Sequence, residues 1–170
     1  MFNSINLYSH SGLEMDVSVL PRGIYMLFLL NSNEGEAVIG RTRLEKLMFL
    51  ISKEVLIQPG RKITPKDYAF RADRFGPFTE EVYDDFETLK DIGLVEYEEN
   101  NQIFKISEKG TNLANKLIKS GKLPSSLLHD IDQIKKRYNK LDLNKLLFYV
   151  YKNYDKYTYE SEIRGKILGE

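Results

Sequence analysis

The sequence contains no cysteine. This absence excludes disulfide bonds, zinc sites built from thiolates, and thiol nucleophiles, and it fits a reducing cytoplasm. Long hydrophobic runs are also missing. The longest, residues 24–30, falls far below the roughly 18 apolar residues that a membrane span needs. It also lacks the basic start and small-residue cleavage site of a secretory signal, so we expect a cytoplasmic protein without a membrane segment.

Residues suited to catalysis are scarce. Of the 2 histidines, His10 lies in a polar amino-terminal stretch and His129 in a predicted helix, so a serine–histidine–acid triad is not expected. No glycine-rich phosphate loop of the Walker or dinucleotide type is present. The sequence has no glycine-rich loop of metal ligands and no histidine in its acidic stretch over residues 80–91, so it does not indicate a bound metal. We therefore predict a binding protein that uses no cofactor, rather than an enzyme.

The composition is otherwise typical of a globular chain. The 170 residues are 42% hydrophobic and 29% charged, which fits one domain, or one domain with an appendage. Residues 1–14 differ from the rest because they are polar and lack a helical period. We predict that they form a flexible tail, with Met15 as a candidate internal start.

The first half of the chain predicts two helices, over residues 22–31 and 42–56. The first follows Pro21 and is apolar almost throughout. In the second, apolar residues recur at helical spacing and form one stripe: Leu44, Leu47, Met48, Ile51 and Val55. Thr42 is the expected N-cap of this helix. Residues 66–75 fit either a short helix or a strand.

A helix followed by a β-hairpin is predicted next. Residues 79–91 form the helix, which Thr79 can cap. Residues 94–98 and 102–106 alternate in hydropathy as two short strands. The turn between them is expected at Asn100 and Asn101, because asparagine tolerates positive φ.

The remaining predicted elements are helical. They are a helix over 108–119 capped by Ser107, a helix over 125–138, a helix over 142–153, and a short one from Thr158. Helix, hairpin and helix in this order form the back half of a winged helix. We therefore predict a mainly α protein with a small β-hairpin (α+β). Its winged-helix-like core spans 15–122, and a C-terminal helical appendage spans 123–170.

Two short passages carry a family resemblance. One lies in residues 41–50 and includes Lys46-Leu-Met-Phe49; the other starts at Phe75-Gly-Pro77 and continues as an acidic helix. Together they resemble the Panacea domain, or SocA-like antitoxin family. In that family a lysine-leucine-leucine-aromatic helix precedes a tyrosine-glycine-proline turn, and here Phe75 stands at the tyrosine position. The resemblance covers residues 40–95. It implies a mainly helical protein that neutralises a toxin or bridges a partner to other machinery.

The acidic helix is the first candidate site. Six carboxylates are predicted on its exposed side: Glu80, Glu81, Asp84, Asp85, Glu87 and Asp91. A winged helix would carry its DNA-reading helix here, yet duplex DNA is held mainly by lysine and arginine and would be repelled. The face is therefore predicted to bind a basic protein partner, such as a toxin. The alternatives are a solvated helix face, or a metal site at Glu81 and Asp85.

A basic stretch is the second candidate. Its residues are Arg41, Arg43, Lys46, Arg61, Lys62, Arg71 and Arg74. Gathered on one surface, they could hold the phosphate backbone of double-stranded DNA, with the 94–106 hairpin as the wing. This reading makes the protein a DNA-binding transcriptional regulator. The alternative is scattered surface charge that pairs with the acidic helix, within the chain or across a dimer. A pI of about 6.8 argues against a protein dedicated to coating DNA.

A tyrosine-rich run follows near the carboxyl end. Tyr149, Tyr151, Tyr154 and Tyr157 accompany apolar neighbours, so the helix over 142–153 is apolar almost all round. Such a helix must be buried on several sides or pack against another subunit. The run therefore fits core packing of the appendage, a homodimer or partner interface, or base stacking.

Overall fold

The computed structural model describes residues 21–57 and 68–170. This part of the chain is mainly helical with a small three-stranded antiparallel sheet, which confirms the predicted α+β class. None of its helices is long and apolar enough to cross a membrane. The predicted tail over 1–14, Met15, Arg61 and Lys62 lie outside the described residues.

The elements follow the predicted order closely. They are α1 (Gly23–Gly35), β1 (Val38–Ile39), α2 (Arg41–Leu50), the π-helix η2 (Ile51–Leu56), α3 (Glu81–Asp91), β2 (Val95–Glu98), β3 (Ile103–Ile106), α4 (Glu108–Lys119), α5 (Ser125–Tyr138), α6 (Leu143–Asn153), the 3-10 helix η3 (Asp155–Tyr157) and α7 (Arg164–Leu168). The long helices and the hairpin begin and end within a few residues of their predicted bounds. The short last helix begins at Arg164 rather than Thr158.

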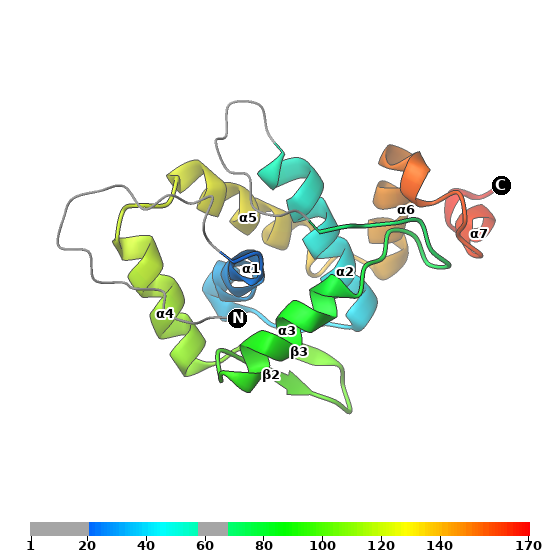
Figure 1. The fold of residues 1–170 in the computed structure, drawn as a ribbon. Helices are drawn as coiled ribbons and strands as arrows, with labels where there is room; N and C mark the ends of the chain where they lie inside the picture. Colours follow the sequence, from blue (N-terminus) through cyan, green and yellow to red (C-terminus); the bar gives the residue numbers. More distant parts are fainter. Residues whose placement is uncertain (1–20, 58–67) are drawn as a thin grey trace.

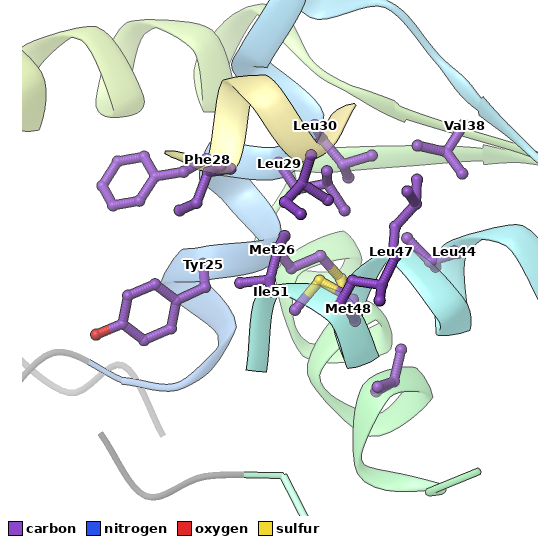
Figure 2. Packing of buried hydrophobic residues seen from close by; sticks show 14 of the residues in the cluster. Tyr25, Met26, Phe28, Leu29, Leu30, Val38, Leu44, Leu47, Met48 and Ile51 are labelled. Atoms are coloured by element: carbon purple, nitrogen blue, oxygen red, sulfur yellow. The ribbon is translucent and has the colours of Figure 1, made fainter. Parts of the chain in front are cut away.

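Helix α1 is the centre of the core. Its residues 24–30 are all buried, as their nearly unbroken apolar sequence requires. In Figure 1 it lies between α4, α5, α2 and α3, and α1 contacts α3, α4, α5 and β3. Figure 2 shows Met26, Leu29 and Leu30 packed toward the buried side chains of α2. The regular helix ends before Ser32, because Asn33 and Glu34 adopt positive φ.

Helix α2 continues into η2 and presents the predicted apolar stripe to this core. All five stripe residues, Leu44, Leu47, Met48, Ile51 and Val55, are buried. The predicted N-cap was wrong. The helix begins at Arg41 after Gly40, not after Thr42, because Gly40 turns the chain out of β1 with a φ of 97°.

The sheet has a strand that was not predicted. Strand β1 pairs with β3, so the strand order is β1-β3-β2. Two residues are too few to produce a readable alternation, which is why β1 escaped prediction. The residue with positive φ in the hairpin is Gln102, not Asn100 or Asn101 as predicted. The Gln102 carbonyl helps to hold the end of β1 against the hairpin, since it accepts a 2.9 Å hydrogen bond from the amide of Gly40, the residue after β1.

The start of α4 packs directly on the chain between α3 and β2. Ser107 caps α4 as predicted, because its hydroxyl accepts a 2.9 Å hydrogen bond from the amide of Gly110. The same hydroxyl donates to the carbonyl of Gly93 at 2.6 Å. Gly110 has no room for a side chain, because an added Cβ would overlap the carbonyl oxygen of Leu94.

Helix α5 covers α1 and shares its hydrophobic cluster. Its buried Lys135 donates to the carbonyls of Leu30 at 3.2 Å and Ser32 at 3.0 Å, which lie at the end of α1. The lysine thus satisfies carbonyls that a helix end leaves without a backbone partner. The predicted division into a core at 15–122 and an appendage at 123–170 stays a prediction, although α5 belongs to the same cluster as α1.

We expect Gly110→Ala to destabilise the protein by at least about 2 kcal/mol, because the new methyl group has no space beside Leu94. Gly165→Ala is the matched control, since the nearest atom to its added Cβ is 3.6 Å away. The control should change the free energy of unfolding by less than about 0.5 kcal/mol. Urea denaturation of both variants checks this, and equal stability would contradict the close packing at Gly110.

Stability should also depend on the titration of Lys135. Burial lowers the pKa of Lys135 from 10.5 to about 8. Between about pH 8 and 10 the unfolded chain therefore holds more protons at this residue, and the unfolding free energy rises with pH by about 2 kcal/mol. Lys135→Met should remove this rise, whereas Lys136→Met, which alters an exposed lysine, should retain it. A wild-type profile that is flat over this interval would contradict the burial of an ionisable Lys135.

Candidate protein-interaction surface

A buried lysine joins α2 to the turn before α3. Lys46 is 0% exposed, and its ammonium donates to the carbonyl of Pro77 at 2.8 Å. It also pairs with the carboxylate of its neighbour Glu45, which accepts a 2.9 Å hydrogen bond from the Tyr83 hydroxyl. Burial lowers the pKa of Lys46, and the Glu45 carboxylate opposes this shift. The two passages on which the family resemblance rests, residues 41–50 and the stretch that starts at Phe75, are therefore joined by the ammonium group of Lys46.

The turn itself is held from both sides. Gly76 adopts a φ of 89°, and its amide donates to the Asp73 carbonyl at 3.0 Å. On either side of the turn, the backbones of Arg71 and Phe78 exchange two hydrogen bonds, of 3.0 and 2.9 Å. A Cβ at Gly76 would lie 2.8 Å from the ring of Tyr151, so only glycine fits against α6. The turn is a rigid connection into α3.

The outward face of α3 carries a row of four exposed acids, Glu80, Asp84, Glu87 and Asp91. We call this row the α3 carboxylate stripe. Its members are spaced four, three and four residues apart, so they follow one line along the helix. Glu80 pairs with Arg71 at 3.0 Å, and Glu87 pairs with Lys90. Within residues 21–57 and 68–170, Asp84 and Asp91 form no ion pair.

The other two predicted acids, Glu81 and Asp85, are half-buried and face Arg22 at the start of α1. Arg22 bonds Glu81 at 2.9 Å and Asp85 at 2.8 Å, and the hydroxyl of Tyr68 donates to Asp85 at 2.7 Å. The Asp85 carboxylate raises the pKa of Arg22. These acids therefore fasten α3 to α1. Glu81 directly precedes the buried Val82, and Asp85 directly precedes the buried Phe86. This spacing is the sequence signal that distinguishes the two acids from those of the exposed stripe.

The described members of the predicted basic set make several different contacts within the chain. Arg41 is exposed and lies over the ring of Tyr83, 4.4 Å from its centroid. Arg43 donates to the carbonyls of Tyr138 and Leu141, at 2.9 and 2.7 Å, and its pKa is lowered by burial. Lys46 is buried.

The last two described members of the basic set form ion pairs. Arg71 binds Glu80, and Arg74 binds Glu162 at 2.7 Å. The pairing of Arg71 with the acidic helix is the intramolecular alternative that the sequence left open. Any phosphate-binding role for this set stays a prediction, and of its described members only Arg41 is exposed without an acidic partner among the described residues.

The tyrosine-rich run packs within the chain. The hydroxyls of Tyr149 and Tyr154 both donate to one oxygen of Glu54, each at 2.8 Å. Tyr151 is buried, and its hydroxyl bonds that of Ser161 at 2.8 Å. The Tyr157 ring meets that of Phe49 nearly edge-on, with 5.1 Å between the centroids. These contacts fit the core-packing reading, and an oligomer interface at these tyrosines stays a prediction.

No arrangement for metal binding is present in the described residues. No three histidine, aspartate or glutamate side chains among them are grouped as metal ligands. Glu81 and Asp85, the candidate pair, bond to Arg22. His129 is exposed on α5.

Sequence reasoning missed three groups near this surface. Arg22 pairs with Asp85, 63 residues away in the sequence, so no local spacing reveals this pair. Glu45 pairs with its neighbour Lys46, whose burial has no signal in the sequence. The hairpin also carries exposed acids on β2 and at its turn: Glu96, Glu98 and Glu99. Of these, Glu96 pairs with Lys105 at 3.2 Å. Counting carboxylates along the hairpin could have found these acids.

Comparison with known proteins gives one family. The model for the domain described as "Antitoxin SocA-like, Panacea domain" matches residues 44–156, more than half of the chain. This confirms the predicted resemblance and extends it from α2 through α6. No curated protein matches. No solved structure matches.

We expect Lys46→Met to destabilise the fold by about 3 kcal/mol, because it leaves the buried Glu45 carboxylate without its cation. The double variant Glu45→Gln with Lys46→Met should recover at least half of that loss. Lys105→Met, which breaks an exposed pair with Glu96, should cost less than about 1 kcal/mol. Chemical denaturation of the three variants provides the measurement. A Lys46→Met variant as stable as Lys105→Met would rule out the buried junction.

Proposed function

The chain belongs to the SocA-like antitoxin family with the Panacea domain, and we propose that it is a non-enzymatic, antitoxin- or adaptor-like protein of the cytoplasm. Its partner is a protein with a basic surface, such as a toxin. The α3 carboxylate stripe is the surface that binds this partner.

The position of the stripe is the observation that carries the proposal. The order α1-β1-α2-α3-β2-β3, with the strands arranged β1-β3-β2, supports the reading of these elements as a winged-helix core. In such a core, α3 is the counterpart of the recognition helix of helix-turn-helix proteins, which enters the major groove. Here that helix presents Asp84 and Asp91 without counter-charges among the described residues. Phosphates would be repelled by this surface, while lysine and arginine side chains would be attracted.

The bonds that hold α3 to the rest of the fold also support the proposed binding surface. Glu81 and Asp85 are already occupied by Arg22, and the turn before α3 is fixed by Lys46. The helix is therefore presented in one orientation before any partner arrives. A preformed surface loses less conformational entropy on binding, which favours affinity.

DNA binding through the basic set remains the alternative, but its described residues offer less support. Lys46 is buried, Arg43 bonds backbone carbonyls, and Arg71 and Arg74 pair with acids. Among its described residues, a regulator of this kind would depend chiefly on Arg41. Its binding to a duplex would weaken steeply as the salt concentration rises.

Charge reversal on the stripe tests the proposal. A pull-down from the native host supplies the partner, which is then purified and titrated by calorimetry. The double variant Asp84→Lys with Asp91→Lys should weaken binding at least about tenfold, mainly through slower association. Glu34→Lys makes the same kind of charge change on an exposed residue at the carboxyl end of α1 and should leave the affinity unchanged.

Two outcomes would overturn the proposal. One is a partner that binds the double variant as tightly as the wild type. The other is a salt-sensitive shift of a DNA duplex in a gel that Arg41→Glu abolishes, together with no captured protein. The second outcome would favour the transcriptional regulator.

A further inference from the structure

Strand β1 lies at one edge of the sheet, with β3 as its neighbour. The amide of Gly40 donates to the Gln102 carbonyl, so Gly40 stands at a hydrogen-bonded position of the ladder. Val38, two residues earlier and aligned with Phe104, stands at the next such position. Hydrogen-bonded and non-hydrogen-bonded positions alternate along an antiparallel strand. The backbone N–H and C=O of Ile39 therefore point away from β3, toward the edge.

The residue two places before Ile39 confirms this direction. Ala37 has the same orientation in the alternation, and its carbonyl accepts a 2.9 Å hydrogen bond from Asn139, which follows α5 and lies outside the sheet. Ile39 differs, because neither its N–H nor its C=O has a hydrogen-bond partner within residues 21–57 and 68–170. A free N–H and C=O on an edge strand can pair with the backbone of an added strand.

A hollow of about 480 Å³ lies along this edge. Its lining residues are Glu36, Ala37, Ile39, Arg43, Asn139 and Lys140. The volume falls within the range of binding pockets in proteins. Because Asn139 bonds Ala37 from the edge side, the end of α5 faces β1 across the hollow. This arrangement leaves less room for the whole sheet of a second copy than for one extended segment.

Two side chains of the lining define what such a segment should carry. Ile39 is 60% exposed, which offers an apolar contact beside the free backbone groups. Arg43 is half-buried, donates to two backbone carbonyls and forms no ion pair in the described part of the chain. Glu36 already pairs with Lys140 at 2.6 Å. Asp142 attracts Arg43, but its carboxylate caps the start of α6. A carboxylate on the segment would supply Arg43 with a counter-charge.

We infer that the β1 edge binds an extended peptide segment of a second protein by strand addition. One residue of the segment exchanges two hydrogen bonds with the backbone of Ile39 and places an apolar side chain beside that of Ile39. An aspartate or glutamate next to it in the segment meets the guanidinium of Arg43. The site shares no residue with the α3 carboxylate stripe. The inference therefore goes beyond the proposed function and gives the protein a second binding surface.

A phage-displayed library of random heptapeptides, panned on the whole 170-residue chain, supplies the probe. The enriched peptides should combine an apolar residue with an adjacent aspartate or glutamate. The most enriched sequence is then synthesised and titrated by calorimetry. Glutamine or asparagine in place of its acidic residue should weaken binding at least about threefold, since the bond to Arg43 becomes uncharged.

Ile39→Pro tests the backbone contact. Proline removes the outward N–H, which takes no part in the pairing with β3, and edge strands tolerate proline at such positions. Ile39→Pro should therefore fold, as circular dichroism melts can check, and should weaken peptide binding at least about fivefold through the lost hydrogen bond. Ile39→Val is the matched control, because it keeps both backbone groups and an apolar side chain. It should change the affinity less than about twofold.

A second measurement leaves the protein unaltered. Each N–H of the peptide is methylated in turn, and the one that bonds the Ile39 carbonyl should lose at least about fivefold in affinity. This series decides the question if Ile39→Pro does not fold.

Three results would overturn the inference. They are a library without enriched sequences, a selected peptide that binds Ile39→Pro as tightly as the wild type, and a peptide indifferent to methylation at every position. A wild-type dimer in sedimentation that Ile39→Pro converts to a monomer would also overturn it, because a second copy would then occupy the edge. None of these results bears on the proposed function, which the variant Asp84→Lys with Asp91→Lys tests on a different surface.

Discussion

The ammonium of Lys46 is the constraint on which the arrangement of this surface depends. It has no contact with water, so its charge must be compensated inside the protein. The Glu45 carboxylate supplies the opposite charge, and the Pro77 carbonyl accepts a hydrogen bond. A charged group buried in this way tolerates few geometries, which fixes the turn relative to α2. The direction in which α3 leaves the turn follows from that.

The acids of α3 divide by the same logic of burial. Glu81 and Asp85 face inward because Arg22 compensates their charge beside the core. The neighbouring face of the helix is exposed to solvent and carries the α3 carboxylate stripe, formed by Glu80, Asp84, Glu87 and Asp91. The ion pairs of Glu81 and Asp85 determine the position of α3. The exposed acids of the stripe determine which charged molecules its surface can attract. An acidic helix at this place in the fold makes a poor surface for DNA and a good one for a basic protein.

Much of the fold could be predicted from the sequence, because apolar spacing identifies α2, α3 and α4 and a serine marks the start of α4. Strand β1 could not, since two residues carry no period. The site was predictable only in part. Helical spacing separates the stripe from the inner acids, but the pairing of Arg22 with Asp85 spans 63 residues and leaves no local signal. Lys46 resembles a surface lysine in sequence, and its burial becomes evident only when the turn packs over it.

Amide hydrogen exchange in the Lys46→Met variant tests the central claim most directly. The amides of Arg71, Gly76 and Phe78 are hydrogen-bonded within the turn, whereas the described backbone of α5 makes no hydrogen bond to the turn. The account predicts faster exchange in the turn and at the start of α3, while α5 keeps its protection. Unchanged protection in the turn would contradict the account, because some other interaction would then hold the α3 carboxylate stripe in place.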